Sequence, residues 1–313
     1  MKFTVAIPAY KDVFLNHTIN SVLQQTFDDF ELIIVNDCSP YGVDKIVKTF
    51  NDKRIRYYVN ERNIGALNVV DNWNKCLSYA SGDYIVLLGD DDIMRKDYLA
   101  EFNTLIIKYP TSYVYHCRSL IINEEGKPFD ITEPRPVKES LFSAILYRLR
   151  GRKQFISDYV FKTEILRERG GFVKFPLAWS SDNVSAYMMM DNGIVNTNET
   201  VFLYRSNQFS ISSTGNIYEK IEAIDTECKW IFDKVSLNRQ DNVDDEIMRK
   251  KILDELPIYK SKMYSLTIYE NRNRSIWKNI KLLYRLRRKY NMSLSVFLNA
   301  YILIFKTKLR NEK

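Results

Sequence analysis

The chain has 313 residues, of which 45% are hydrophobic and 27% charged, and its formal net charge at pH 7 is +7. This composition excludes collagen-like and intrinsically disordered proteins, and the length allows one large domain or one domain with an appendage. The four cysteines are widely spaced and form no C-x-x-C pair, which argues against a zinc site or a secreted disulfide framework, so we expect a cytoplasmic protein.

The N-terminal segment MKFTVAIPAYKD has a short apolar run broken by Pro8 and no small-residue cleavage site, so we expect a first strand there and not a signal peptide. Short β-rich runs then occupy 3–8, 30–37, 54–60 and 83–89, and segments with helical spacing separate them. This βαβαβαβ order predicts a mostly parallel sheet with helices on both faces. Ligands of such sheets bind at the carboxyl ends of the strands.

The loops that follow these four strands read PAYKD, NDCSP, NERNIGALN and GDDD. They contain neither the G-x-G-x-x-G of dinucleotide-binding enzymes nor the G-K-[ST] of P-loop enzymes. Three consecutive aspartates, Asp90, Asp91 and Asp92, follow an apolar strand, where desolvation makes each carboxylate costly. A divalent cation among them would offset that cost. The alternative is a turn followed by a helix cap, although a turn needs only one aspartate.

The pattern from 110 to 230 is more irregular, with expected strands at 112–122 and 200–207. From about 231 onward the chain reads as helices, with a break expected at Pro257. We therefore predict a domain over 1–230 and a basic, helical C-terminal region over 231–313.

The C-terminal segment carries most of the positive charge. Residues 271–313 hold twelve Lys or Arg against one acid, a net charge of +11, which leaves −4 for the rest of the chain. Basic amphipathic helices of this kind suit the anionic inner surface of a bilayer, so we expect a possible peripheral membrane contact. The alternative is a pair of helices that pack on the domain with a solvated basic face. Nucleic acid fits poorly, because the apolar residues form long runs.

Three stretches carry a family resemblance: FTVAIPAYKDVFLNHTINSVLQQTFDDFELIIVNDCSP, NIGALNVVDNW and SGDYIVLLGDDDI. They resemble the N-terminal signature of glycosyltransferase family 2, the inverting enzymes with a GT-A fold, and the resemblance runs from residue 3 to about 215. It implies an α/β, Rossmann-like, mostly parallel mixed sheet flanked by helices, here with a C-terminal helical appendage. It also implies a nucleotide-diphospho-sugar donor, a divalent metal (Mn²⁺ or Mg²⁺) at a D-x-D motif, and direct displacement at the anomeric carbon.

The resemblance assigns donor-binding roles to residues of the first three loops. These are Pro8, Ala9 and Tyr10 against the nucleobase, with Asp12 a weaker candidate, Asp37 as an acceptor from the base, and Asn63 and Gly65 beside the nucleoside. A purely structural role remains open for several of them: packing for Tyr10, a turn for Asp37 and a helix start for Gly65.

The acidic triplet departs from the common D-A-D-D pattern, because Gly89 precedes it. The resemblance then implies that Asp90 contacts ribose or phosphate, and that Asp92, with Asp91 close behind, binds the metal. Further along, Asp182 after the GGF segment is the expected catalytic base, since an acceptor hydroxyl needs a positioned carboxylate to take its proton. The alternative for Asp182 is a helix N-cap.

Arg205 in YRSNQFSIS is the expected neutralising partner of the leaving phosphates. Two residues later many relatives carry a histidine, whereas this chain has Asn207, so a third protein ligand to the metal is not expected.

The resemblance therefore implies an inverting glycosyltransferase with a UDP-sugar donor. With the basic C-terminal segment, it leads us to expect an enzyme of the cytoplasm or of the inner face of the cell membrane, which acts on a saccharide or lipid-linked saccharide in capsule, lipopolysaccharide or other cell-surface polysaccharide synthesis. Two alternatives stay open: a sugar-nucleotide pyrophosphorylase-like enzyme, and a non-catalytic nucleotide- or sugar-binding GT-A module.

Overall fold

The computed structural model describes residues 3–207, 216–238, 241–271 and 276–311. The chain separates into two compact units, Met1–Ser213 and Thr214–Lys313. The boundary expected between 230 and 231 falls within helix α9 (Ile217–Ser236), because that helix already begins at Ile217, after the N-cap residue Asn216. The Oδ1 of Asn216 accepts a hydrogen bond from the Tyr218 N–H, which is an N-cap interaction.

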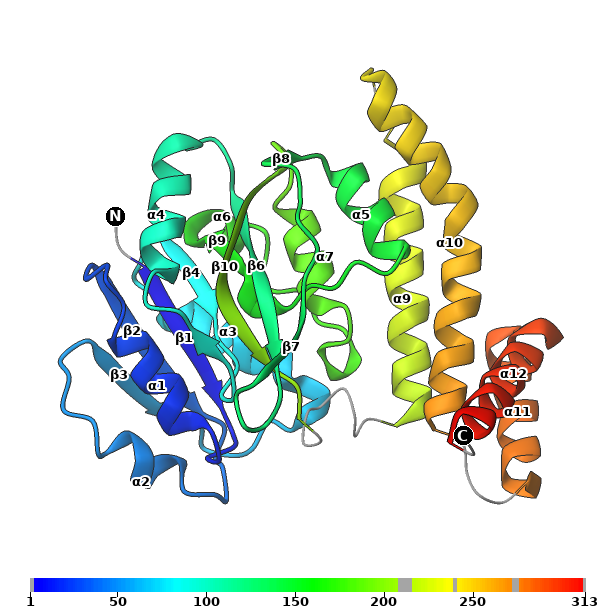
Figure 1. Cartoon of the computed structure of the whole chain (residues 1–313), viewed down its shortest axis with the longest axis horizontal. Helices are drawn as coiled ribbons and strands as arrows, with labels where there is room; N and C mark the ends of the chain where they lie inside the picture. Colours follow the sequence, from blue (N-terminus) through cyan, green and yellow to red (C-terminus); the bar gives the residue numbers. More distant parts are fainter. Residues whose placement is uncertain (1–2, 208–215, 239–240, 272–275, 312–313) are drawn as a thin grey trace. The chain divides into compact units, whose positions relative to one another are not determined.

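One side of the sheet in the first unit is parallel and has the strand order β3, β2, β1, β4 (Figure 1). The elements are β1 (Phe3–Ala9), α1 (Leu15–Leu23), β2 (Phe30–Asn36), α2 (Val43–Val47), β3 (Ile55–Val59), the 3₁₀ turn η1 (Ala66–Asn68), α3 (Val69–Tyr79) and β4 (Tyr84–Leu87). The predicted βαβαβαβ order is confirmed. Because the four strands are parallel, the loops at their carboxyl ends lie along one edge of the sheet.

Helices cover both faces of these strands, which explains why the strands read as continuous apolar runs. Phe3, Val5 and Ile7 of β1 belong to a buried cluster that also contains side chains of α1, α2 and α4 (Tyr98–Lys108). Ala6, which alternates with them, is also fully buried, and α3 packs against β1 and β2. In Figure 1, α1 and α3 accordingly lie on opposite sides of the parallel strands.

Beyond β4 the sheet continues in the order β9, β6, β10, β5, and antiparallel pairings appear. The elements are β5 (Ile93–Met94), β6 (Val114–Ile122), β7 (Pro128–Ile131), β8 (Lys138–Glu139), α5 (Leu141–Leu149), η2 (Ile156–Asp158), β9 (Tyr159–Lys162), α6 (Thr163–Glu168), η3 (Pro176–Ala178), α7 (Ser181–Met188) and β10 (Ile194–Arg205). The strand expected over 200–207 is the end of the longer β10, which runs parallel to β6. This mixed sheet flanked by helices confirms the predicted fold class.

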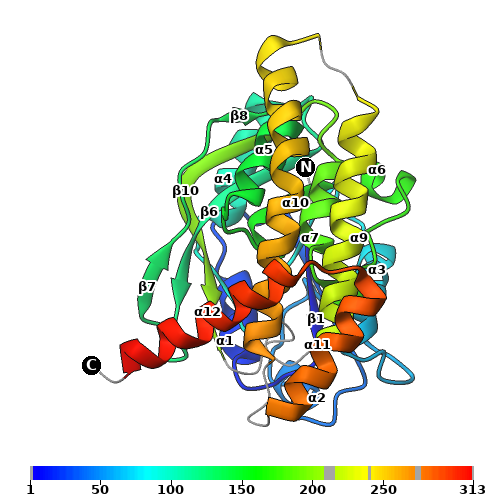
Figure 2. The same cartoon turned by 90° about the vertical axis from the view of Figure 1, so that its right-hand side faces the viewer.

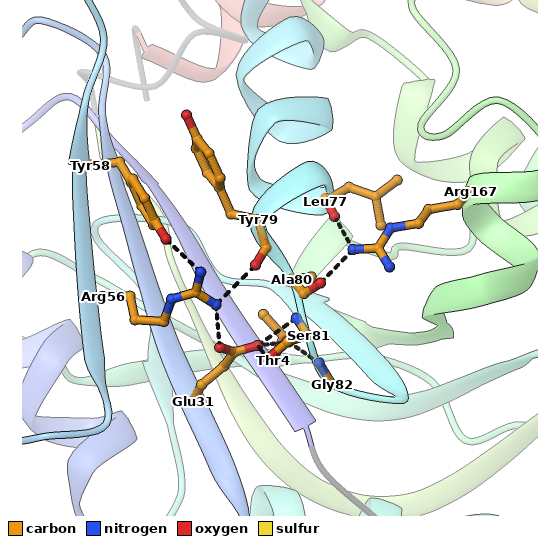
Figure 3. Close-up of polar contacts among 10 residues, drawn as sticks. All are labelled: Thr4, Glu31, Arg56, Tyr58, Leu77, Tyr79, Ala80, Ser81, Gly82 and Arg167. Carbon is orange, nitrogen blue, oxygen red and sulfur yellow. Dashed lines mark hydrogen bonds and ion pairs between the residues drawn. The ribbon is translucent and has the colours of Figure 1, made fainter.

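Buried polar contacts join the strands at the opposite, amino-terminal edge (Figure 3). Glu31 of β2 accepts hydrogen bonds at Oε1 from the Thr4 hydroxyl (2.7 Å) and from the Ser81 N–H (2.6 Å). Its Oε2 lies 2.7 Å from an Arg56 guanidinium nitrogen of β3. Nearby, the Arg167 guanidinium donates to the Leu77 carbonyl at 2.8 Å. The amino ends of three strands are thus joined by one carboxylate.

The second unit is helical, as predicted for the C-terminal region. It contains α9, α10 (Val243–Glu270), α11 (Ile276–Tyr290) and α12 (Leu294–Asn311). Figure 2 shows α9 and α10 side by side and α12 crossing α10. The break expected at Pro257 is wrong, because Pro257 lies inside α10 on an exposed position, where water can hydrate the carbonyl left without an N–H partner. Among the residues described, no helix is both long and apolar enough to span a bilayer.

Candidate active site

The loops after β2 and β3 are joined by Asp37, which is buried at the carboxyl end of β2. Its Oδ1 accepts hydrogen bonds from the Asn60 side chain (2.8 Å) and from the Ile64 N–H (2.9 Å). The Asn63 side chain donates to the Asp37 carbonyl at 2.8 Å. Gly65 has a φ of 82°, a left-handed conformation that favours glycine. The structure therefore brings together three of the residues predicted to bind the donor, and Asp37 holds the other two.

The loop after β1 is joined in turn to the loop after β4. The Oδ2 of Asp90 accepts hydrogen bonds from the Tyr10 N–H (2.8 Å) and the Lys11 N–H (2.7 Å). The Asp12 carboxylate accepts from the Gly42 N–H at 2.8 Å, which connects the same loop to the start of α2. Asp90 thus fixes the backbone beside Pro8 and Ala9, a role that the sequence did not suggest.

Two exposed aromatic rings lie in the loops after β1 and β2. Tyr10 is 37% and Tyr41 is 55% exposed, and their rings meet edge to face with centroids 5.7 Å apart. The Ser39 hydroxyl donates to the Tyr10 carbonyl at 2.5 Å. Ser39 and Tyr41 were not among the predicted site residues, because the loop NDCSP gives no local signal for a contact with the loop after β1.

The acidic triplet lies between β4 and β5 in the chain and contacts the end of β10. Asp92 is 4% exposed, and its Oδ1 accepts from the Arg205 N–H at 2.9 Å. The Oδ2 of Asp91 accepts from the Asn207 side chain at 2.6 Å. Burial, reinforced by the Asp91 charge, raises the pKa of Asp92 well above its ordinary value and that of Asp90 to about 6. The protein itself therefore supplies less positive charge than these carboxylates require.

This shortage of positive charge fits a divalent cation held by one or two carboxylates and completed by phosphate oxygens. The structure shows no self-sufficient protein cage: the described part of the chain contains no group of three or more His, Cys, Asp or Glu side chains placed to hold a metal ion. Asp92 and Asp91 are the residues whose chemistry and position suit such a cation.

Arg205 is buried, and part of its guanidinium donates hydrogen bonds to backbone carbonyls. Its Nε donates to the Asp91 carbonyl (2.9 Å), and one terminal nitrogen donates to the carbonyls of Asn123 (3.0 Å) and Glu124 (2.9 Å). The guanidinium also lies over the Phe14 ring, 4.3 Å from its centroid. In this arrangement Arg205 positions the triplet against β10. Its contact with the leaving phosphates stays a prediction.

Asp182 is the second residue of α7 and is not its N-cap, which is Ser180 with a φ of 64°. The hydroxyl of Ser181 accepts a hydrogen bond from the Phe175 N–H at 3.1 Å. Burial and the charges of Asp92, Asp91 and Asp182 together raise the pKa of Tyr204. Tyr204 therefore lies within electrostatic reach of both the triplet and Asp182, although 90 residues separate Asp182 from Asp92 in the sequence.

Several buried polar residues that are not among the predicted site residues lie near the triplet and Asp182. The Ser157 hydroxyl lies 3.5 Å from Oδ2 of Asp92, and the Ser119 hydroxyl donates to Asp158. Burial raises the pKa of Asp158 to about 7. His116 is fully buried with Nε2 3.6 Å from the Asp158 carboxylate, and burial lowers the pKa of His116. These residues come from β6 and η2 and carry no local motif.

The fold and the edge at which these carboxylates gather define a GT-A-type α/β enzyme site. A family model described as Glycosyl transferase family 2 matches residues 4–164. The chain belongs to glycosyl transferase family 2 and is a glycosyltransferase.

Individual relatives and structures agree with this assignment. The chain is 26% identical to TuaG of Bacillus subtilis, a glycosyltransferase named for teichuronic acid biosynthesis, over 75% of this chain and 94% of that protein. It is 31% identical to the Escherichia coli glucosyltransferase WfgD, named for UDP-Glc and a diphosphoundecaprenol acceptor, over 38% of this chain and 47% of that one. The Staphylococcus aureus TarS fragment 1–349 in complex with UDP-GlcNAc superimposes with a TM-score of 0.66, at 18% identity, over 87% of this chain and 82% of that chain.

Proposed function

We propose that this glycosyltransferase moves a sugar from a UDP-sugar to an acceptor hydroxyl, with inversion at the anomeric carbon, during assembly of a cell-surface polysaccharide such as a capsule or lipopolysaccharide. The observation that carries the proposal is the gathering of Asp37 and the residues Asp90, Asp91 and Asp92 at the carboxyl edge of the parallel strands, with Tyr204 in electrostatic reach of both the triplet and Asp182.

The donor half of the site binds the nucleotide in this proposal. Tyr10 and the neighbouring Pro8 pack against the base, whereas Ala9 is fully buried and supports the loop from the core. Asp37 accepts from the base through oxygen lone pairs that remain beside its contacts with Asn60 and Ile64. The backbone at Gly65 lies close to the nucleoside because it carries no side chain. Asp90 keeps the Tyr10 loop in place through the two N–H groups that it already binds.

Asp92 and Asp91 would hold the divalent cation. When bound, a hard cation supplies charge neutralisation for the diphosphate leaving group. The raised pKa of Asp92, which is due first to burial and then to the Asp91 charge, supports this assignment, since two neighbouring carboxylates without enough cations are unfavourable in a buried site. The Arg205 N–H keeps Asp92 in place by binding Oδ1.

Asp182 is the proposed catalytic base. As the acceptor oxygen forms its bond to the anomeric carbon, the bond from that carbon to the phosphate oxygen breaks and its electron pair leaves with UDP, while the acceptor proton passes to the Asp182 carboxylate. The position of Asp182 in the first turn of a helix keeps the backbone around it rigid.

We further propose that the acceptor is a saccharide or lipid-linked saccharide and that the enzyme works in the cytoplasm, with a peripheral contact to the inner face of the membrane. The names of TuaG and WfgD support a cell-surface pathway, and the four free cysteines suit a reducing compartment. Basic side chains on the exposed part of α11, among them Arg285 and Arg288, support attraction to anionic lipid.

Calorimetric titration of UDP and of GDP into the metal-free protein, with and without manganese, tests the donor assignment. We expect UDP to bind only with manganese, and the affinity to fall at least about tenfold in Asp92→Ala, since a lost metal ligand typically costs that much or more. Asp28→Ala is the control, because Asp28 is a strongly exposed aspartate on the surface. Manganese-independent UDP binding that Asp92→Ala leaves unchanged would refute the metal assignment, and preference for GDP would refute the UDP assignment.

A further inference from the structure

A hollow lies within the first unit, and the end of β10 forms part of its wall. It has a volume of about 360 Å³, in the range of small-molecule sites. Its walls include three cations, Arg148, Arg152 and Lys153, and three aromatic rings, Phe129, Phe155 and Tyr204. None of the residues that line it is acidic.

The hollow adjoins both parts of the catalytic site. On one side Tyr204 and Ser206 flank Arg205, whose N–H binds Asp92. On the other side Gln154, which also lines the hollow, donates a hydrogen bond to the side chain of Asn183, the neighbour of Asp182. A molecule in the hollow would therefore contact Tyr204, the side chain that lies within electrostatic reach of both the proposed base and the proposed metal ligands.

The charged groups of the hollow are only partly matched by the protein. A terminal nitrogen of Arg152 lies 2.6 Å from Glu139, and Lys153 pairs with Asp130. The Nε of Arg152, however, is buried without a hydrogen-bond partner among the described residues. A buried donor left unpaired costs about 1–3 kcal/mol, so such a group is often completed by water or by a ligand.

The aromatic walls provide a flat apolar surface. The rings of Phe155 and Tyr204 are stacked with centroids 3.8 Å apart and planes 10° apart. Phe129 of β7 is 63% exposed, so its ring is accessible at the wall of the hollow. A sugar ring offers apolar C–H faces that such surfaces bind, while guanidinium and ammonium groups bind anions.

We propose that this hollow is an acceptor subsite for an anionic saccharide. Arg152 and Lys153 bind its phosphate or carboxylate group, and the aromatic rings pack against a sugar ring. The inference rests on the proposed function, because it assumes that the acceptor hydroxyl is presented to Asp182. It deepens that function by naming the chemical class of the acceptor: a sugar with negative charge close to the hydroxyl that is glycosylated.

The test measures acceptor binding separately from chemistry. Three probes, N-acetylglucosamine 1-phosphate, glucuronic acid and neutral N-acetylglucosamine, are titrated into the full chain and followed by ligand-observed NMR. Each titration is repeated with excess UDP and manganese, so that binding at the donor site is recognised by competition. Preference for the phosphate probe or for the carboxylate probe then identifies the anion.

Lys153→Gln and Phe129→Ala are the informative variants, because both side chains are largely exposed and their loss should leave the fold intact. Lys174→Gln is the matched control: the Lys174–Asp71 pair has side-chain exposures of 46% and 44%, close to the 55% and 40% of Lys153–Asp130. We expect each informative variant to weaken anionic-probe binding about three- to tenfold, and Lys174→Gln to leave it unchanged, with UDP affinity constant throughout.

Two results would overturn the subsite. One is equal affinity, or no affinity, for the neutral and anionic probes; the other is anionic binding that UDP displaces and Lys153→Gln does not alter. Failure of the proposed function has a different signature: UDP does not bind, or donor hydrolysis in water is absent, whatever the probes do.

Discussion

The carboxylate of Glu31 should stabilise the first unit in a strongly pH-dependent way. Hydrogen bonds and the Arg56 charge outweigh desolvation and lower the pKa of Glu31 from 4.5 to about 2. A difference of that size corresponds to about 3 kcal/mol in the free energy of unfolding at neutral pH. The Arg56 side chain is 41% exposed, so solvent screening reduces the expected contribution to about 1–2 kcal/mol.

The sign of the pH dependence follows from the direction of the shift. Because the pKa is lower in the folded state, the unfolded chain binds the additional proton between pH 4.5 and about 2, and the stabilisation is lost as the pH falls through that interval. Glu31→Gln removes the charge but keeps one acceptor oxygen for Thr4 and Ser81. We therefore expect the variant to be less stable than the parent above about pH 5 and to match it near pH 2.

Urea unfolding of both proteins at several pH values from 7 to 2 measures this difference. Glu168→Gln, at an exposed position on α6, is the control and should unfold like the parent at every pH. A Glu31→Gln penalty that is constant with pH would show that the charge does not stabilise the fold. Turnover per folded molecule should not change, because Glu31 lies at the edge of the sheet opposite the acidic triplet.

Two further predictions concern the catalytic edge. A Cβ at Gly89 would lie 2.7 Å from Oδ2 of Asp92, so Gly89→Ala should displace that carboxylate. We expect calorimetry to show manganese-dependent UDP binding weakened about tenfold, and thermal unfolding to show little change in the melting temperature. Unchanged UDP affinity would contradict this prediction. Asp182→Asn should lower kcat of sugar transfer by a factor of about 10²–10⁴ and leave UDP affinity unaltered, whereas a loss in UDP binding alone would place Asp182 on the donor side.

The parallel half of the fold could be predicted because its signal is local. The strands at 3–8 and 30–37 are apolar on both faces, and their loops carry residues whose side chains have short-range preferences. The same reasoning located Asp37 and the aspartates 90–92 correctly at the carboxyl edge. It could not find the contact between Asp90 and the Tyr10 backbone, because a hydrogen bond across 80 residues has no sequence period.

The rest of the candidate site depends on such long-range contacts. Arg205 looks like an available cation in the sequence, yet its guanidinium binds carbonyls of Asn123 and Glu124, which a hairpin of β6 and β7 brings to it. Pro257 suggests a helix end, yet tertiary packing of α10 overrides the local preference. In both cases long-range contacts determine the surroundings of the residue, and these contacts cannot be read from the local sequence.

The two edges of the parallel sheet treat buried carboxylates in opposite ways, and this contrast supports the functional assignment. Glu31 at the amino edge has an arginine and several donors, so its pKa is lowered and its charge is satisfied within the protein. Asp92 at the carboxyl edge has a raised pKa, because its burial and, after that, the charge of Asp91 outweigh the hydrogen bond from the Arg205 N–H. The fold therefore satisfies a buried carboxylate at the amino edge and leaves one unsatisfied at the carboxyl edge. The unsatisfied carboxylate lies where we expect a cation and a diphosphate to bind.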